Sequence, residues 1–469
     1  MTSRPQQEQL TIQRLGVRPE GELAFPPIQS RELAVRVAEV WGGTPRSFMH
    51  AILGPDEAHA EHIDLADPRA AGWAFIVGRD DPRKRELTLA LKRLAEHRGM
   101  PDASSPLELD AKEPEWADWV QDKKMAAARK DLRFPRYLLL AGDPEHLPFR
   151  FQALLGSKHQ VGRVDFDSIS DLQCYVDKVI RLESAESPIT DRSAVFFGTD
   201  HGPKDPTHHS LRHMLGPLAG RCRDVLGFRT SEVKAEEATR PRLIEAVTQQ
   251  RCALLYTASH GLCLSHAEPL STRRALNGAI ACHPAPDGSS QFSAGDIPKG
   301  PFLEGGVYFQ FACHGYGTPD QSEFDRWFPE DIPTPASTPF VAALPKRLLA
   351  HSRGPVAYIG HVDSAYVHAF LDPEDPRSEA TWRNRIHPFS HAMDQLLRVQ
   401  PAALAMDGMA ERLVHANAQI TNRISLLKSD AKVEDPASED IANAWIHRTD
   451  AQNYFVLGDP AARLRVPRI

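Results

Sequence analysis

The sequence predicts an α/β fold in which a mostly parallel sheet lies between two layers of helices, with a smaller α/β subdomain ahead of it. Two observations predict this arrangement. Short, fully apolar runs recur along the chain, and segments with apolar residues at helical spacing separate them. Strands that are apolar on both faces are typical of parallel sheets covered by helices on both sides.

The smaller subdomain is expected at residues 71–185. GWAFIVG (72–78) predicts a buried strand, and ELTLALKRLAEH (86–97) predicts a helix after it. YLLLAGDPEHLP (137–148) predicts a second strand that ends in a Gly-Asp-Pro turn, and residues 161–183 predict a short strand followed by a capped helix. Residues 1–70 contain one amphipathic stretch, at 31–41, and no assignable chemistry.

The larger domain is expected at residues 190–469, where strands and helices continue to alternate. Its expected strands are SAVFFGTD (193–200), a short strand near 231–233, ALLYTASHG (253–261), GGVYFQFACHG (305–315), GPVAYIGHVD (354–363) and NYFVLGDPAARLRV (453–466). Its expected helices are 210–225, 241–250, 340–352 and a long helical region at 389–427. Two segments, 318–339 and 372–385, have the composition of surface loops inserted into this domain.

Composition excludes several classes of protein. The formal charge of -7 is spread without a basic block, which argues against nucleic acid as a ligand. The N-terminus lacks the apolar core of a signal peptide, and we find no apolar run long enough to span a membrane, so a cytoplasmic location is expected. The six cysteines lack CxxC spacing, and neither a disulfide framework, a metal site nor a cofactor is predicted.

Two consecutive buried strands end in residues suited to nucleophilic catalysis. YTASHG places His260 and Gly261 after one strand, and FQFACHG places Cys313 after the next. Because the carboxyl ends of parallel strands share one edge of a sheet, we expect these side chains to meet there. An imidazole promotes formation of the reactive thiolate and can then protonate a leaving amine. The sequence thus predicts Cys313 as nucleophile and His260 as its proton-transfer partner.

The same strand ends offer hydrogen-bond donors for a developing oxyanion. The backbone N–H groups of Gly261 and Cys313 are the expected donors, because a glycine lets a substrate carbonyl approach the backbone closely. The strand-end histidine and the strand-end cysteine each have an ordinary structural explanation when taken alone. A cysteine that ends an apolar strand, for example, is more often an inert core residue. Their joint occurrence about fifty residues apart favours catalysis. Cys263 is the rival nucleophile and ranks below Cys313, because no ACxG strand end surrounds it.

Residues 134–469 resemble the gingipain family of cysteine peptidases and, more distantly, the caspase-related CHAT and separase domains. The matching stretches are YLLLAGDPEHLP, VGRVDFDSISDLQCYVDKVI, YTASHG, FQFACHG, GPVAYIGHVDSAY and NYFVLGDPAARL. The resemblance implies a caspase-like three-layer sandwich and endopeptidase activity carried by His260 and Cys313.

The resemblance implies roles for three further residues. Asp200 falls where gingipain-like enzymes place an acid that orients the catalytic histidine, although an acid that caps a turn is an equal alternative. Asp363 resembles the aspartate that separase-like peptidases present to an arginine at the cleavage site, with a turn or cap residue as the alternative. Tyr366 is expected in the same pocket. Cleavage after Arg, less often Lys, is therefore expected.

The two predicted loops are the expected sites of regulation. By family analogy the peptidase is inactive until one of the loops, 318–339 or 372–385, is cleaved or ordered by an activating protease or regulatory protein, as in bacterial defence signalling. Protein substrates are the expected partners. A catalytically silent protein-binding scaffold, and an acyl hydrolase or transferase that uses the same dyad, are the alternatives.

Overall fold

A computed structural model of the whole chain describes residues 11–12, 15–24, 28–29, 33–35, 37, 64–112, 116–129, 133–265, 267–323, 338–371, 385–428 and 439–467. Within these residues, none of the helices combines the length and the apolar character that crossing a membrane requires. Most of the loop expected at 318–339 and nearly all of the loop expected at 372–385 lie outside the described residues.

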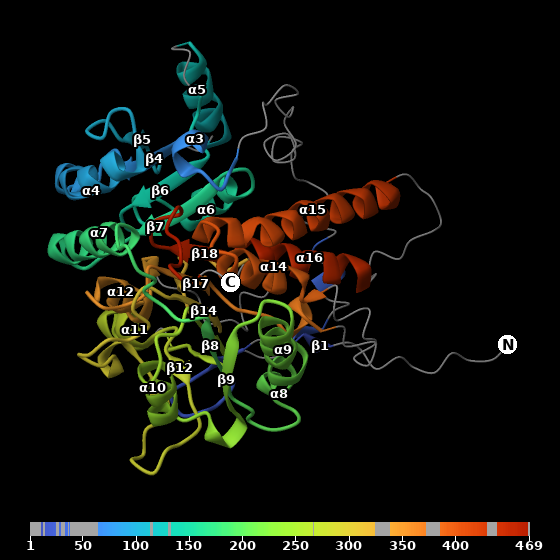
Figure 1. Cartoon of the computed structure of the whole chain (residues 1–469). Coiled ribbons are helices and arrows are strands. Elements are labelled where there is room, and N and C mark those ends of the chain that lie inside the picture. Colours follow the sequence, from blue (N-terminus) through green and yellow to red (C-terminus); the bar gives the residue numbers. More distant parts are fainter. Residues whose placement is uncertain are drawn as a thin grey trace.

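One ten-stranded sheet runs through the molecule (Figure 1). From edge to edge its strands are β5 (Leu107–Leu109), β4 (Trp73–Gly78), β6 (Tyr137–Ala141), β7 (Gln160–Val164), β18 (Tyr454–Leu457), β17 (Ala357–His361), β14 (Val307–Phe311), β10 (Leu254–Ala258), β8 (Ser193–Gly198) and β9 (Arg229–Lys234). These elements match the strands expected from the apolar runs, apart from β5 and the exact ends of the others.

The sheet consists of two parallel halves that run in opposite directions. Every neighbouring pair is parallel except β17 and β18, which are antiparallel. The last strand, β18, therefore joins the half formed by β4 to β7, although it is the final strand in the chain. The predicted mostly parallel sheet is confirmed. Its carboxyl ends lie at opposite edges in the two halves, so the ends of β8, β10, β14 and β17 share one edge.

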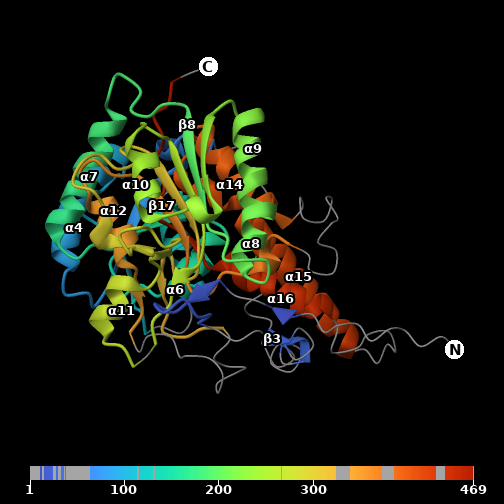
Figure 2. The same ribbon diagram turned by 90° about the horizontal axis from the view of Figure 1, so that it is seen from below.

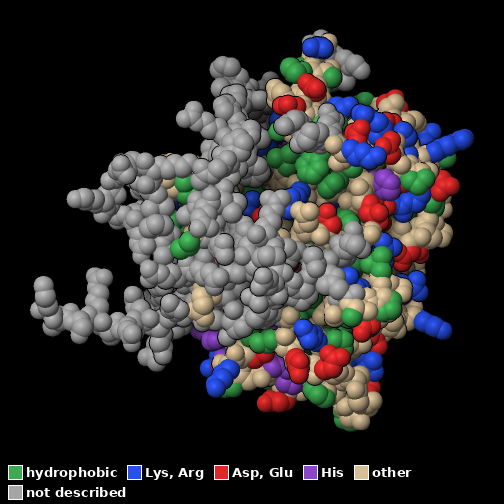
Figure 3. Space-filling model, turned by 180° about the vertical axis from the view of Figure 1, so that it is seen from behind, with side chains coloured by type: hydrophobic (Ala, Val, Ile, Leu, Met, Phe, Trp, Pro, Cys, Tyr) green, Lys and Arg blue, Asp and Glu red, His purple; other side chains and the backbone are tan. Residues whose placement is uncertain are grey.

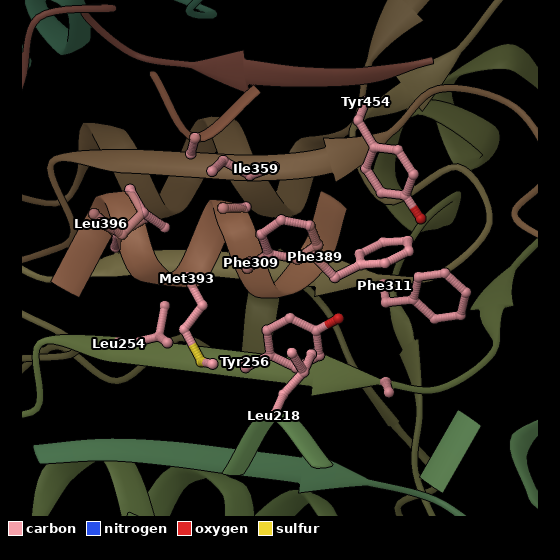
Figure 4. Packing of buried hydrophobic residues seen from close by; sticks show 14 of the residues in the cluster. Leu218, Leu254, Tyr256, Phe309, Phe311, Ile359, Phe389, Met393, Leu396 and Tyr454 are labelled. Atoms are coloured by element: carbon pink, nitrogen blue, oxygen red, sulfur yellow. The ribbon is translucent and has the colours of Figure 1, made fainter. Parts of the chain in front are cut away.

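Helices cover both faces of the sheet, as predicted (Figure 2). One apolar cluster joins alternate strand residues to α4 (Lys84–Arg98), α7 (Ile169–Glu183), α10 (Arg240–Thr248) and α12 (Ala343–Ala350). On the other face, a second cluster joins the intervening strand residues to α9 (Gly216–Asp224), α14 (His387–Leu397) and α15 (Asp407–Lys428). Figure 4 shows this second core, where Phe389 and Met393 of α14 lie over Phe309 and Tyr256 of the sheet. The alternation of strand side chains between faces builds both cores.

The remaining elements are short or peripheral. They include α3 (Pro68–Ala71), α5 (Trp116–Ala128), α6 (Phe149–Gly156), α8 (Pro206–Ser210), α11 (Leu270–Leu276), α16 (Glu439–Gln452) and a small sheet of β13 (Gln291–Phe292), β12 (Ile280–Ala281), β11 (Gly261–Leu262) and β2 (Gly16–Val17). The ribbon β15 (Gly317–Thr318) and β16 (Phe340–Val341) closes the base of one predicted loop.

Two of the expected helical regions are interrupted. The region 389–427 divides into α14 and α15, because Val399 adopts φ +63° and a 3₁₀ turn (Ala402–Met406) follows Pro401. The region 210–225 contains a π-helical turn (Leu211–Leu215) between α8 and α9. Of the stretch 31–41, only residues 33–35 and 37 are described, and they are helical.

The described surface carries mixed charge. On the face in Figure 3, the described Lys and Arg side chains lie among those of Asp and Glu. This mixing agrees with the scattered charge seen in the sequence.

A buried carboxylate ties β18 to the first half of the sheet. Asp459, fully buried after β18, accepts hydrogen bonds from Trp73 Nε1 (3.0 Å) and Arg98 Nε (2.7 Å). Arg98 also binds both carboxylate oxygens of Glu183 at 2.7 Å, and the Asp459 N–H donates to the Tyr175 hydroxyl at 2.6 Å. The second Gly-Asp-Pro turn therefore anchors β18, and through it β17, to α4 and α7.

Removing Asp459 should destabilise the fold strongly. Asp459→Ala leaves the buried Arg98 with one fewer carboxylate, and losing one partner of a buried pair costs about 3–5 kcal/mol. Denaturant unfolding of the purified protein measures the change. Asp224→Ala, which removes an exposed acid paired with Arg223, is the control and should cost about 1 kcal/mol or less. Equal costs for the two variants would contradict the anchoring role.

Candidate active site

The register of the sheet places the predicted site residues in one row. Strand β10 pairs with β14 so that Ala258 lies opposite Phe311, and with β8 so that Ala258 lies opposite Gly198. Asp200, His260 and Cys313 each stand two residues after the level residues Gly198, Ala258 and Phe311 of their own strands. Strand β14 pairs with β17 with Phe309 opposite Ile359, which brings Asp363 level with Cys313. These four residues follow four neighbouring strands at a single edge.

Hydrogen bonds beyond the strand ends keep this row together. Ser259 N–H donates to the Phe311 carbonyl at 3.2 Å, and His314 N–H donates to the Asp363 carbonyl at 2.8 Å. A Cβ atom on Gly261 would lie 1.9 Å from the carbonyl oxygen of Cys313. The backbone after His260 thus lies directly against the backbone of Cys313, and only glycine fits there. The backbones of His260 and Cys313 thus lie at the same level of adjacent strands, as the sequence predicted, while their role as a dyad stays a prediction.

Asp205 orients His260. His260 Nε2 lies 2.9 Å from both carboxylate oxygens of Asp205. Because an ionised carboxylate only accepts hydrogen bonds, Nε2 carries the hydrogen and Nδ1 presents its lone pair. Nδ1 is buried and has no hydrogen-bond partner in the described structure, and the His260 side chain is 1% exposed. Nδ1 is therefore the nitrogen left to exchange a proton with a neighbouring thiol.

The surroundings keep Asp205 ionised. Burial by itself raises the pKa of Asp205, but the hydrogen bond and charge of His260 and the hydrogen bonds from Thr207 outweigh it and lower that pKa to about 2. Asp205 also caps α8, because its side chain accepts from the Thr207 N–H at 2.9 Å. The N-cap geometry fixes the carboxylate that holds the imidazole.

A second histidine stacks on the first. The rings of His201 and His260 lie 5.6 Å apart at an interplanar angle of 27°, and His201 stacks on His283 at 4.6 Å. Burial, helped by the charges of His260 and His283, lowers the pKa of His201 to about 4. His201 is therefore neutral near pH 7 and leaves Asp205 as the charged partner of His260.

Asp200 holds a different histidine. Its carboxylate lies 3.0 Å from His208 Nδ1 and accepts from the Gly202 N–H at 3.0 Å. The acid on His260 is thus Asp205, five residues along the chain from the acid that the sequence suggested. Asp205 stands before a proline at the start of α8, a sequence signal for a helix cap. That signal does not reveal which side chain the cap faces, so sequence reasoning missed it.

The Cys313 sulfur lies in a buried, hydrogen-bonded position. Cys313 is 0% exposed and belongs to the large core cluster on the α14 face. The Ala365 N–H donates to Cys313 Sγ at 3.2 Å. The Cys313 thiol in turn donates to the Ala365 carbonyl at 3.9 Å. Of the two predicted oxyanion donors, the Gly261 N–H donates to the carbonyl of Leu15 at 3.2 Å.

Asp363 lines a cavity whose other lining residues include Arg150 and Arg448 but not His260 or Cys313. The cavity has a volume of about 800 Å³, and its lining includes Phe149, Glu323, Asp363 and Trp445. Asp363 adopts φ +79° and accepts a hydrogen bond from the Ser322 hydroxyl at 2.7 Å.

Tyr366 is fully buried in a separate apolar cluster. That cluster contains Leu33, Ile441 and Trp445. Asp363 thus faces a space large enough for a substrate side chain, whereas Tyr366 packs among core residues.

The other cysteine and histidine candidates have structural positions. Cys263 follows β11, is 9% exposed and packs with Ala24. His283 Nε2 contacts the Asp200 carbonyl at 2.9 Å, and Cys282 is buried.

One cluster outside this row has metal-ligand chemistry. In the described residues, Asp81, Asp143 and His146 bring ligand atoms within 4.8 Å of one another. The Arg83 guanidinium already lies between these acids, 3.4 Å from Asp81 and 2.7 Å from Asp143. Its positive charge already pairs with both acids.

No family model and no curated protein matches the chain. Among solved structures, it is similar to the Arg-specific cysteine proteinase gingipain R, at 15% identity and a TM-score of 0.44, over 84% of this chain and 78% of that one.

Two other structures have similar values. The complex of the pro- and mature domains of RgpB from Porphyromonas gingivalis is 15% identical, with a TM-score of 0.45 over 83% and 79% of the two chains. A structure described as a protease is 12% identical, with a TM-score of 0.43 over 86% and 81%. The gingipains are also the family that the sequence resembles. Identities this low transfer no activity, so the function must be argued from the residues of the site.

The Asp205–His260 pair should make stability depend on pH in acid. The pKa of Asp205 is lowered from 3.8 to about 2 on folding, so the unfolded chain binds the proton more tightly. The pair's stabilisation is complete above about pH 4 and is lost as the pH falls towards 2, by about 2 kcal/mol.

Urea unfolding of wild type and Asp205→Asn between pH 2 and 5 measures this difference. Asp320→Asn, which removes an acid of the same charge at an exposed position, is the control. If wild type and Asp205→Asn show the same slope across that window, the ion pair does not form in solution.

Proposed function

We propose that this protein is a cysteine endopeptidase that cleaves protein chains after arginine, less often lysine. One observation carries the proposal: a cysteine and a histidine lie level at the ends of adjacent strands, and a carboxylate fixes the histidine with its Nδ1 lone pair available. Cysteine, imidazole and carboxylate in this order form the arrangement that activates a thiol nucleophile.

The chemistry follows from the positions of the three groups. His260 Nδ1 takes the proton of the Cys313 thiol, and Asp205 stabilises the imidazolium that results. The thiolate attacks the carbonyl carbon of the scissile amide, and the carbon–nitrogen bond breaks as His260 returns the proton to the leaving amine. Water then hydrolyses the thioester, which releases a carboxylic acid and restores the thiol.

The backbone supports the developing negative charge. The N–H groups of Gly261 and Cys313 are the proposed donors, and the lack of a side chain on Gly261 lets the two backbones approach each other closely. Two such donors in a site without bulk water stabilise an oxyanion by several kcal/mol; one donor is typically worth about 3–4 kcal/mol. The Ala365 N–H supports the thiolate before attack.

Asp363 supports the preference for a basic residue. It is level with Cys313 in the sheet register and lines a cavity of about 800 Å³. A largely buried carboxylate pairs most favourably with a guanidinium, which can donate two hydrogen bonds to it. Ser322 holds the carboxylate in place through a 2.7 Å hydrogen bond. A lysine ammonium can pair with the same group but without the bidentate geometry.

Replacing the nucleophile should abolish cleavage and leave the fold intact. Cys313→Ala removes the thiol, and loss of a catalytic nucleophile lowers turnover on the order of 10⁶-fold. Cleavage of a library of fluorogenic peptides by purified protein measures the effect, with thermal unfolding as a check on folding. Cys263→Ala, which changes the neighbouring buried thiol, should retain the wild-type rate within about twofold.

A matched pair of acids tests which carboxylate serves His260. Asp205→Asn should lower turnover about 10²–10⁴-fold, the range of general acid–base catalysis. Asp200→Asn removes the partner of His208 instead and should leave turnover nearly unchanged. Assays with thioester substrates, run in parallel, distinguish peptide cleavage from general acyl hydrolysis.

Peptide cleavage by Cys313→Ala at the wild-type rate would refute the proposed nucleophile.

Replacing Asp363 should remove the preference for basic residues. In Asp363→Ala the cavity loses its buried carboxylate, so arginine at the cleavage position should lose about 10²-fold in kcat/KM relative to alanine or leucine, the order expected for an unpaired charge. Positional-scanning peptides measure the preference. Glu145→Ala, which removes a second acid that lines the same cavity, is the control. Retained arginine preference in the Asp363 variant would show that another group selects the substrate.

A further inference from the structure

A strand from the N-terminus of the chain lies against the candidate active site. Strand β2 pairs in parallel with β11, the two residues that directly follow His260, with Gly16 opposite Gly261 and Val17 opposite Leu262. The Cys263 N–H donates to the Val17 carbonyl at 2.8 Å. More than 240 residues of chain separate the partners, as their numbers show, so tertiary packing and not local folding brings them together.

The peptide groups of Leu15 contact the same atoms that a bound substrate would need. The Leu15 carbonyl accepts the Gly261 N–H at 3.2 Å, and this N–H is one of the two expected oxyanion donors. The Leu15 N–H donates to the Ala365 carbonyl at 3.3 Å. The Ala365 N–H in turn donates to the Cys313 sulfur. The main chain of one residue thus bridges the histidine strand and the segment that contacts the thiol.

Burial shows that this contact is part of the folded core. Leu15 is fully buried and belongs to the same apolar cluster as Cys313. Val17 is 5% exposed and packs with Leu262, Leu264 and Ala281. A side chain in such a position excludes water and other peptides from the same space.

A hairpin holds the strand in place. Ala24 N–H donates to the Gly16 carbonyl at 2.8 Å, and Arg18 N–H donates to the Glu22 carbonyl at 2.8 Å. The turn between them, residues 18–22, is exposed. The segment 15–24 therefore folds as an exposed turn attached to a buried strand, and the hairpin holds the C-terminal end of that strand.

We propose that the edge of β11 and the Ala365 carbonyl form the main-chain binding site for an extended peptide substrate, and that residues 15–17 of the same chain occupy it as a tethered blocking strand. The proposal rests on the proposed peptidase function and extends it to the form of the substrate. A substrate must present a segment without internal hydrogen bonds, because its carbonyl groups pair with the N–H groups of Gly261 and Cys263.

The blocking strand has the extended main chain that a substrate would need, but it lacks the basic side chain that the proposed substrates carry at the cleavage position. Leu15 has no positive charge to pair with Asp363. Its apolar side chain is fully buried instead. Full activity therefore requires that residues 15–17 leave β11, by displacement through a competing peptide or by removal of the N-terminal segment. Because the strand is tethered to the same chain, its effective concentration at the site is high and independent of protein concentration.

The accessibility of Cys313 tests occupancy without relying on peptidase activity. Iodoacetamide labelling of Cys313, followed by peptide mass mapping, compares wild type with Leu15→Asp, whose charged side chain is unfavourable in an apolar core. Labelling should be at least about tenfold faster in the variant, which corresponds to a loss of at least about 1.4 kcal/mol of strand docking. Glu20→Gln, in the exposed turn of the same hairpin, is the control and should label like wild type.

A peptide added in trans should restore the block. The synthetic peptide of residues 11–24, TIQRLGVRPEGELA, should slow the labelling of Cys313 in Leu15→Asp, and the same peptide with aspartate at position 15 should not. Thermal unfolding establishes that Leu15→Asp is folded. Amide hydrogen exchange of the wild-type protein gives a test that needs no variant. The Gly261 and Cys263 amides should both be protected. Exchange at the rate of an unstructured peptide would overturn the proposal.

The outcomes distinguish this inference from the proposed function. Faster labelling with no peptide cleaved by any form of the protein would support occupancy and refute the peptidase. Peptide cleavage at equal rates by wild type and folded Leu15→Asp, with equal labelling, would overturn the blocking strand and leave the peptidase standing. Faster labelling together with an increase in kcat/KM for arginine peptides supports both.

Discussion

The in-register pairing of β10 with β14 is the constraint on which the candidate site depends. Parallel strands separated by about 4.8 Å bring His260 and Cys313 level with each other when Ala258 lies opposite Phe311. A shift of one residue would turn one of these side chains towards the opposite face of the sheet. The cores on both faces prevent such a shift, because alternate residues of each strand belong to different apolar clusters. The packing of helices on the sheet therefore also positions the catalytic groups.

The antiparallel contact of β17 with β18 divides the sheet into a half that ends at the candidate site and a half that ends in structural turns. The half that contains β8, β10, β14 and β17 directs its carboxyl ends to the candidate site, and the other half directs its carboxyl ends to the opposite edge. There the two Gly-Asp-Pro turns use their acids for structure: Asp459 pairs with Arg98, and Asp143 pairs with Arg83. Similar turns thus serve as anchors at one edge while the other edge carries the candidate catalytic groups.

The buried thiol and the N-terminal strand are two aspects of one arrangement. The proposed nucleophile is 0% exposed and could not meet a protein substrate without a change in its surroundings, and residues 15–17 occupy the hydrogen-bonding groups to which we propose that a substrate binds. The proposed blocking strand assigns a regulatory role to a part of the sequence to which composition and pattern assigned no chemistry. The loops expected to regulate the enzyme, 318–339 and 372–385, lie largely outside the described residues, so their role stays a prediction.

The sequence by itself determined most strands of the large sheet, the main helices that cover it and the residues that end the strands, because the apolar periodicity of strands and helices is a local property. It thereby predicted His260, Gly261, Cys313 and Asp363 at one edge of a mostly parallel sheet. Only the tertiary structure decided which acid holds His260, since Asp200 and Asp205 both follow β8 and the cap of α8 turns Asp205 towards the imidazole. It also decided that Tyr366 packs in a separate core and that Leu15 contacts Gly261. These contacts join residues far apart in the chain, and their geometry depends on packing that no local pattern encodes.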